Sequence, residues 1–243
     1  MNLILDVGNT YAKLAVFNKN KIVNKHIIKA SVLLSTVKKI LKNYPQINNA
    51  ILSSVGNLKD KKLSRIQAAV DLMILDSFVN LPFNNLYQSP ETLGSDRIAL
   101  VGATSLKYPD QNVLIIDAGT CITYDIITEE NSYLGGSISP GIGLRYQSLH
   151  NLTANLPLLS QKKPKGIIGS NTQESIHSGV INGVVSEIQG VIGEYEREFK
   201  ELTVILTGGD AEFLSKQLKS SIFANSNFLL EGLNHILEYN LRK

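Results

Sequence analysis

One sequence pattern occurs twice in this chain and restricts the folds that the chain can adopt. In residues 3–17 and again in residues 114–127, a short apolar run ends in an aspartate, a turn containing Gly follows, and a β-prone segment returns. Each copy predicts a strand, a tight turn and a second strand. A single Asp-x-Gly is common turn chemistry and indicates only a turn. Two copies, each opening one half of the chain, predict an internal duplication whose halves face each other across a cleft.

The turn of the first copy carries groups suited to binding phosphate. Gly8 lets the backbone approach a ligand closely, and Asn9, Thr10 and Lys13 can all donate hydrogen bonds to phosphate oxygens. Asp6 cannot bind phosphate directly, but a carboxylate beside such donors can hold a hydrated Mg²⁺ or orient water around it. The first hairpin is therefore a candidate site for a phosphorylated ligand.

Strand and helix signals alternate along the rest of the chain. Apolar residues at helical spacing predict a helix from Leu33 to Tyr44 that stops at Pro45, and a second amphipathic helix around residues 229–237. A strand is predicted at residues 71–75, and a buried strand at residues 204–210, whose Gly-Gly end is suited to lying against a nucleotide. This alternation predicts α/β layers.

A polar loop precedes the apolar helix that runs to about Leu106, and its last residues are Gly94, Ser95, Asp96 and Arg97. Two interpretations are open. Ser95 or Asp96 can cap the helix by accepting its first N–H groups, with Arg97 on the surface. Alternatively, the helix N-terminus binds an anion, with Arg97 as the partner of a carboxylate, or only orienting Asp96, and Asp96 as the base for a hydroxyl.

A long helix is predicted from Thr172 onward, and Thr172 is a candidate for its N-cap. Its apolar face is too continuous for a surface helix, and Gly179 and Gly183 would allow another helix to pack closely, within the chain or across a dimer. The glycine-rich segment 135–143 likewise indicates close approach of the backbone to a ligand or to another element.

Composition argues against several classes of function. The formal net charge is only +3 and the lysines are scattered, so nucleic-acid binding is not indicated. No apolar run is long enough to cross a bilayer, so we expect no membrane association. Cys121 is the single cysteine, which excludes an internal disulfide, favours a role in the turn or core, and predicts a cytoplasmic protein. The four histidines lack metal-ligand spacing, so no transition metal is predicted.

The paired hairpins resemble the phosphate-binding hairpins of the acetate and sugar kinase, heat-shock and actin superfamily. Over essentially the whole chain, six short motifs resemble those of the type III pantothenate kinases, also described as the Baf family. These are Asp6-Val7-Gly8-Asn9-Thr10 with Lys13, Gly94-Ser95-Asp96-Arg97, Asp117-Ala118-Gly119-Thr120, Gly135-Gly136-Ser137-Ile138-Ser139-Pro140-Gly141, Asn155-Leu156-Pro157 and Thr207-Gly208-Gly209. Residues 227–233 depart from the more acidic pattern of the family.

The resemblance implies an α/β, duplicated ribonuclease H-like (actin-like ATPase) fold with two similar halves flanking an ATP cleft. Residues 1–110 would form the half with the first phosphate hairpin and the substrate loop, and residues 111–243 the half with the second hairpin and the nucleotide site. The implied activity is ATP-dependent phosphorylation of the primary hydroxyl of pantothenate to 4'-phosphopantothenate, the first step of coenzyme A biosynthesis.

The resemblance also implies roles for individual residues. ATP would be held by Asp6, Val7, Gly8, Asn9, Thr10, Tyr11, Ala12, Lys13 and Thr120, with Mg²⁺ accompanying the nucleotide. Asp96 would accept the proton of the hydroxyl, and Tyr87, Gly94, Ser95, Asp96, Arg97 and Thr172 would contact pantothenate. Asp117 matches the ligand of a monovalent cation, K⁺ or NH₄⁺. The resemblance further implies a homodimer in which the Thr172 region reaches the partner's pantothenate site.

Three rival interpretations make different demands on the sequence. A kinase of the same superfamily acting on another small alcohol or acid would share the hairpins but lack the match over residues 94–97. A non-catalytic regulator would not need Asp96 and Lys13 together. An actin-like filament or chaperone ATPase would need insertions that 243 residues hardly accommodate.

Overall fold

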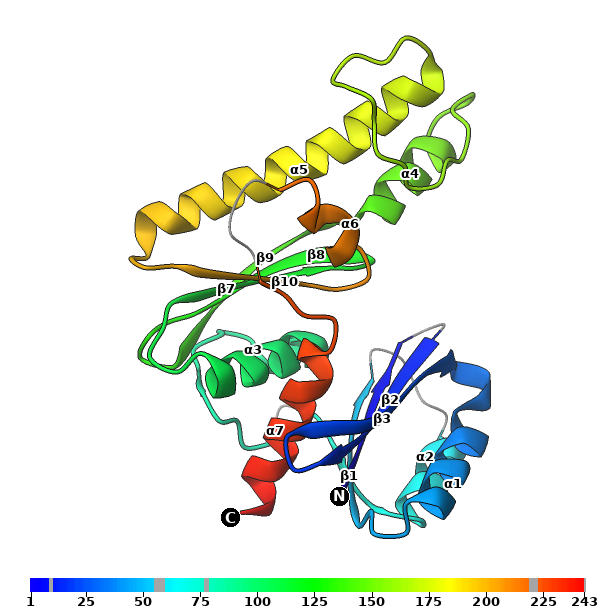
Figure 1. The fold of residues 1–243 in the computed structure, drawn as a ribbon, viewed down its shortest axis with the longest axis vertical. Coiled ribbons are helices and arrows are strands. Elements are labelled where there is room, and N and C mark those ends of the chain that lie inside the picture. Colours follow the sequence, from blue (N-terminus) through cyan, green and yellow to red (C-terminus); the bar gives the residue numbers. More distant parts are fainter. Residues whose placement is uncertain (9–10, 55–59, 77–78, 219–222, 243) are drawn as a thin grey trace. The chain divides into compact units, whose positions relative to one another are not determined.

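The computed structural model describes residues 1–8, 11–54, 60–76, 79–218 and 223–242. The chain forms two compact units, the first made of residues 1–109 and 227–243 and the second of residues 110–226 (Figure 1). The boundary near residue 109 lies beside the expected one, but the last helix packs in the first unit. Gly232 explains this packing, because a Cβ there would lie 1.8 Å from the Ala99 carbonyl oxygen of the same unit.

The sheet of the first unit has the strand order β3-β2-β1-β4-β5. β1 pairs antiparallel with β2 and parallel with β4, β2 pairs antiparallel with β3, and β4 pairs parallel with β5. The strands are β1 (Asn2–Val7), β2 (Tyr11–Asn18), β3 (Lys21–Lys29), β4 (Asn49–Ser54) and β5 (Asp71–Ile74). The short strand β6 (Asn84–Asn85) is not part of this sheet.

Helices cover both faces of this sheet (Figure 1). They are α1 (Leu33–Asn43), α2 (Asp60–Gln67), α3 (Ser95–Lys107) and α7 (Phe228–Leu241), with the 3-10 turns η1 (Ala30–Val32) and η2 (Pro90–Thr92). Leu3, Leu5 and Val7 of β1 pack in a core with α1, whereas Asn2 on the opposite face donates a hydrogen bond to Asn234 Oδ1 of α7 at 2.9 Å. Because side chains alternate along a strand, Asp6 shares the face of Asn2.

The second unit repeats this topology. Its strands lie in the order β9-β8-β7-β10-β11, with β7 antiparallel to β8, β8 antiparallel to β9, and β10 parallel to both β7 and β11. The strands are β7 (Val113–Ala118), β8 (Cys121–Ile127), β9 (Ser132–Pro140), β10 (Thr203–Thr207) and β11 (Phe223–Ala224). The repetition of strand order and direction confirms the predicted duplicated α/β fold.

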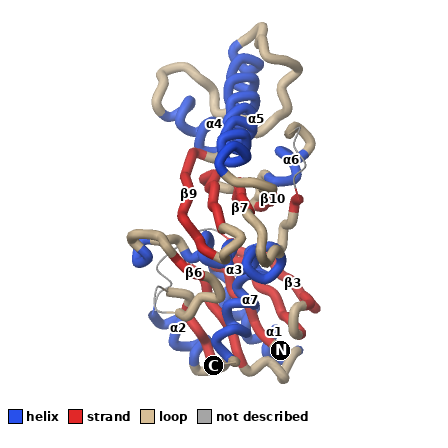
Figure 2. Tube along the Cα trace, turned by 90° about the vertical axis from the view of Figure 1, so that its left-hand side faces the viewer, coloured by secondary structure: helices blue, strands red, loops and turns tan. Residues whose placement is uncertain are grey.

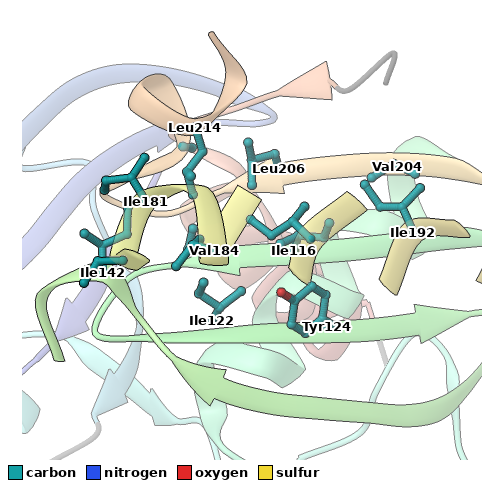
Figure 3. Close-up of a cluster of buried hydrophobic side chains, with 14 of the residues drawn as sticks. Ile116, Ile122, Tyr124, Ile142, Ile181, Val184, Ile192, Val204, Leu206 and Leu214 are labelled. Carbon is teal, nitrogen blue, oxygen red and sulfur yellow. The ribbon is translucent and has the colours of Figure 1, made fainter. Parts of the chain in front are cut away.

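One long helix covers a face of the second sheet. The helices of this unit are α4 (Ile142–Asn151), α5 (Thr172–Glu198) and α6 (Ala211–Ser215), and Figure 2 shows α4 beside α5. Val184 and Ile192 of α5 pack against Ile116, Ile122 and Tyr124 of the sheet (Figure 3). The apolar face of α5 that the sequence shows is therefore buried within its own unit.

The structure corrects the expected start of α5. Asn171, rather than Thr172, is the N-cap, and its Oδ1 accepts a hydrogen bond from the Glu174 N–H at 3.0 Å. Thr172 is the first helical residue, so its side chain is not committed to capping. Over the described part of the chain, no helix is both long and apolar enough to cross a bilayer.

Candidate active site

The first hairpin turn is held by its own backbone. The Gly8 N–H donates to the Tyr11 carbonyl oxygen at 3.0 Å, and a Cβ at Gly8 would lie 3.2 Å from that oxygen. The side chains of Val7 and Ala12 are buried in the core with α1, so only their backbone is available to a ligand. Tyr11 is 56% exposed. Asn9 and Thr10 lie outside the described residues.

Asp6 and Lys13 face each other across this hairpin. They are register partners on β1 and β2, and Lys13 Nζ lies 3.8 Å from Asp6 Oδ2. Burial raises the pKa of Asp6, the Lys13 ammonium opposes the shift, and the neighbouring Asp96 carboxylate adds to it. The site therefore holds a carboxylate whose charged form is poorly solvated, beside a lysine that is 40% exposed.

The raised pKa of Asp6 predicts how the stability of the protein depends on pH. At pH 7 the ionised carboxylate costs the folded protein more than the unfolded chain, and this cost disappears as the pH falls through the folded-state pKa. We expect Asp6→Asn to raise the melting temperature by a few degrees at pH 7, because the contact with the partly exposed Lys13 at 3.8 Å does not offset the burial of the carboxylate. The gain should shrink toward pH 4.

Thermal unfolding of both proteins at the two pH values measures this difference. Asp71→Asn is the matched control, since Asp71 is an exposed carboxylate at the start of β5 in the same unit. A lower melting temperature for Asp6→Asn than for wild type at pH 7 would contradict the prediction.

The loop that is expected to contact substrate meets the same sheet face at the N-terminus of α3. Ser95 Oγ lies 2.9 Å from the fully buried Ser53 Oγ on β4, and Ser53 is the register partner of Asp6. Asp96 Oδ1 accepts the Arg97 backbone N–H at 2.8 Å. Gly94 lies under this carboxylate, because a Cβ there would be 2.4 Å from Asp96 Oδ1. The loop is thus anchored to the strand next to Asp6.

Arg97 is buried, with 5% of its surface exposed, and is not the surface residue that one interpretation of the sequence expects. Its guanidinium lies over the ring of Tyr87, with 5.4 Å between Cζ and the ring centroid. This contact brings together two residues expected to bind substrate and holds a planar, permanently charged group that can pair with a carboxylate.

The second hairpin turn is built like the first. The Gly119 N–H donates to the Cys121 carbonyl oxygen at 2.9 Å, and Thr120 is exposed. Gly208, at φ +98°, lies against Asp117, since a Cβ there would be 2.5 Å from Asp117 Oδ1. Thr120 and Asp210 line a cavity of about 640 Å³ in this unit. Thr172 instead lines a different cavity of about 660 Å³, together with Arg145.

The predicted residues therefore form separate groups. In the first unit, Asp6 and Lys13 lie beside the Asp96 loop, and Arg97 lies against Tyr87. In the second unit, Asp117 lies on β7 near the hairpin turn that contains Thr120, while Thr172 opens α5. Sequence analysis missed Ser53; the signal was a serine at the end of an otherwise apolar strand.

Comparison with known sequences identifies the family of this chain. The family model for type III pantothenate kinases matches residues 2–194. A type III pantothenate kinase from Christiangramia forsetii is 51% identical over 240 residues, which are 99% of each chain.

Solved structures show the fold at lower identity. A Baf family protein from Campylobacter jejuni is 20% identical, with a TM-score of 0.65 over 99% of this chain and 100% of the other. A glucokinase from an Antarctic psychrotroph is 13% identical, with a TM-score of 0.53 over 98% of each chain. These likenesses confirm the actin-like ATPase fold, and the family match and the sequence identity together show that the chain belongs to the type III pantothenate kinase family.

Proposed function

We propose that this protein, as a type III pantothenate kinase, transfers the γ-phosphoryl group of ATP to the primary hydroxyl of pantothenate, with Asp96 as the proton acceptor. The product is 4'-phosphopantothenate, and the reaction is the first step of coenzyme A biosynthesis. The observation that supports the residue assignment is the anchoring of the Asp96 loop beside Asp6, because Ser95 Oγ lies 2.9 Å from Ser53 Oγ and Ser53 is the register partner of Asp6.

Phosphoryl transfer requires neutralised charge on the phosphates, an alcohol held in line, and a carboxylate to take its proton. The turn that follows Asp6, with Lys13 and Thr120, supplies donors for the phosphates of ATP. Ser95 positions the loop through Ser53, so that Asp96 meets the hydroxyl. Arg97, fixed against Tyr87, is the partner for the pantothenate carboxylate.

Kinases of this family use ATP together with a divalent metal. The Asp6 carboxylate fits a hydrated Mg²⁺ carried by the nucleotide, because its poorly solvated charge would gain from a nearby cation or the water ligands of that cation. The metal would neutralise phosphate charge, and Lys13 would share that task. Asp6 would hold the water shell rather than the phosphate itself.

A coupled assay of ADP release tests the activity. Purified protein with ATP and Mg²⁺ should release ADP with pantothenate and not with a panel of other small alcohols and hydroxy acids. Preference for another compound of the panel would redirect the assignment to a kinase of the same superfamily with a different substrate. No release with any of them would support a non-catalytic protein.

Asp117 is the candidate ligand for a monovalent cation. Asp117 is the next-to-last residue of β7, close to the second turn, and its carboxylate lies against Gly208. A K⁺ or NH₄⁺ ion there would offset repulsion between this carboxylate and the phosphates of ATP. We therefore expect activity to depend on K⁺ or NH₄⁺, and Asp117→Asn to raise KM for ATP. Steady-state kinetics in K⁺, NH₄⁺ and Na⁺ buffers measure this, and full activity in Na⁺ with Mg²⁺ would contradict it.

A homodimer is the oligomeric state that we propose. The segment before α5 exposes large apolar side chains, among them Leu152 (83% exposed), Ile167 (76%) and Ile168 (87%). Gly179 and Gly183 leave open space along α5, where an added Cβ would meet no described atom within 4 Å. A second copy of the chain would bury these groups.

The single cysteine, Cys121, supports a cytoplasmic location.

A further inference from the structure

Glu187, on the sheet-facing side of α5, accepts hydrogen bonds from three elements at once. Its Oε1 receives the Tyr124 hydroxyl of β8 at 2.9 Å and the Ser139 hydroxyl of β9 at 2.5 Å. Its Oε2 accepts a hydrogen bond from Arg145 Nη2 of α4 at 2.5 Å. None of these residues has a role in the proposed chemistry.

Sheet register brings these donors together. Tyr124 pairs with Ser137 and Ile122 with Ser139, so Tyr124 and Ser139 are diagonal neighbours on the face that α5 covers. Tyr124 lies beneath α5 in the core, with its hydroxyl oxygen at the end of the ring (Figure 3). The cluster is therefore a polar patch at the edge of the hydrophobic core.

Glu187 is the carboxylate of this cluster and is ionised, as is its partner Arg145. Burial alone would raise its pKa, but the hydrogen bonds from Ser139, Arg145 and Tyr124 outweigh burial and leave the pKa below the usual value. Burial and the Glu187 contact raise the pKa of the Tyr124 hydroxyl, so it remains a donor. A charged carboxylate that accepts several hydrogen bonds, one of them from a guanidinium, holds its neighbours in place more strongly than a neutral group would.

Arg145 connects this carboxylate to the second phosphate turn. Its Nε donates to the Pro140 carbonyl oxygen at 2.9 Å, and its Nη2 also donates to Ser139 Oγ at 2.9 Å. The next residue, Gly141, donates its N–H to the Thr120 carbonyl oxygen at 3.0 Å. The backbone of Gly141, directly after β9, packs tightly against the turn, because a Cβ at Gly141 would lie 2.1 Å from the Gly119 carbonyl oxygen.

We propose that Glu187 and Arg145 are positioning residues for nucleotide binding, which hold the Gly119-Thr120 turn in place through Pro140 and Gly141. The inference rests on the proposed role of Thr120 at the ATP phosphates. Neither side chain contacts the nucleotide. Both act by fixing the backbone of Pro140 and Gly141, which contacts the turn.

Nucleotide affinity tests the proposal, because it does not require turnover. We expect Glu187→Gln to weaken binding of Mg·ADP, measured by titration calorimetry, and to raise KM for ATP, each by about tenfold, because a displaced binding turn loses its alignment. KM for pantothenate should change by less than about twofold, since the turn is not assigned to that substrate. Arg145→Lys keeps the charge but cannot make the same set of contacts, so it should act in the same direction.

Two controls separate positioning from general destabilisation. Glu194→Gln removes an exposed carboxylate paired with Arg197 at 2.8 Å on the same helix and should leave nucleotide affinity unchanged. Ile192→Val removes one methyl group from the same hydrophobic core, at a residue that is 1% exposed, and should lower stability without touching the cluster. Thermal unfolding compares its loss of stability with that of Glu187→Gln. Where Glu187→Gln does not fold, Arg145→Lys and Ser139→Ala carry the test.

The outcomes are distinguishable from failure of the proposed function. If wild type phosphorylates pantothenate but Glu187→Gln and Arg145→Lys bind Mg·ADP as well as the Ile192→Val control, the cluster is only structural and the inference is overturned. If wild type binds Mg·ADP but phosphorylates nothing, the proposed reaction fails, while weaker binding in both variants still supports the positioning role.

Discussion

Asp96→Asn is expected to lower kcat by about 10²–10⁴ while leaving the binding of ATP and pantothenate largely intact. The proton of the attacking hydroxyl must be accepted as the new bond to phosphorus forms, and an amide cannot accept it. The substitution should preserve the local structure, because an amide oxygen can still accept the Arg97 backbone N–H that Asp96 Oδ1 accepts at 2.8 Å. The expected loss is therefore in turnover rather than in folding.

Steady-state kinetics and binding titrations of the purified variant measure the two effects separately. Asp71→Asn makes the same chemical change at an exposed position of the same unit and should retain wild-type kcat. Thermal unfolding checks that both variants fold. A near-normal kcat for Asp96→Asn would leave Asp96 with its contact at the start of α3 and no catalytic role.

The structure contradicts the capping interpretation in part, because Gly94 is the N-cap of α3 and Arg97 is buried rather than on the surface. One carboxylate oxygen contacts a backbone N–H in the first turn of α3, which is the capping type of contact, although Gly94 is the formal N-cap. A carboxylate has a second oxygen, so this contact does not exclude a role as a base. A sequence pattern identifies an aspartate at this position, but it does not show which of the two carboxylate oxygens makes which contact.

Local patterns predicted the elements of the fold well. The predicted helix from Leu33 to Tyr44 is α1 (Leu33–Asn43), and both Asp-x-Gly stretches form antiparallel hairpins. These predictions succeed because hydrophobic periodicity and turn chemistry act over a few neighbouring residues. The identical strand order of the two units could be anticipated only because the hairpin pattern is repeated.

Contacts between distant segments could not be predicted in the same way. Ser53 and Ser95 are separated by 42 residues, and Tyr124 and Glu187 by 63. No local pattern marks such pairs, because the fold decides which residues meet. Thr172 shows a smaller limit: Asn171 and Thr172 are both good capping residues, and only the backbone geometry identifies Asn171 as the N-cap.

The apolar face of α5 shows how a correct pattern can support a weaker conclusion. The sequence predicts that this face is buried, and Val184 and Ile188 are indeed fully buried against the sheet of their own unit. The face therefore gives no argument for a dimer. The support for a dimer comes instead from the exposed apolar side chains of Leu152, Ile167 and Ile168.

A mixture of two inactive variants is expected to recover up to about a quarter of wild-type activity if the dimer shares its substrate pocket. The variants are Asp96→Asn and Thr172→Arg, and both must still dimerise. Thr172 is exposed at the first position of α5 and lines a cavity, so an arginine there would obstruct a substrate bound as we propose, without disturbing the N-cap on Asn171. In a mixed dimer, one site then carries both lesions and the other carries neither.

The size of the recovery follows from random exchange between equal amounts of the two proteins. About half of the dimers are then mixed, and one of the two sites in each mixed dimer is intact. Asp96→Asn mixed with Lys13→Met is the matched control. Both residues belong to the first unit, and each site of that mixed dimer keeps one lesion. Co-purification of differently tagged subunits demonstrates exchange. If exchange is demonstrated and the Asp96→Asn and Thr172→Arg mixture stays as inactive as its parents, Thr172 acts in the site of its own chain and the shared pocket is wrong.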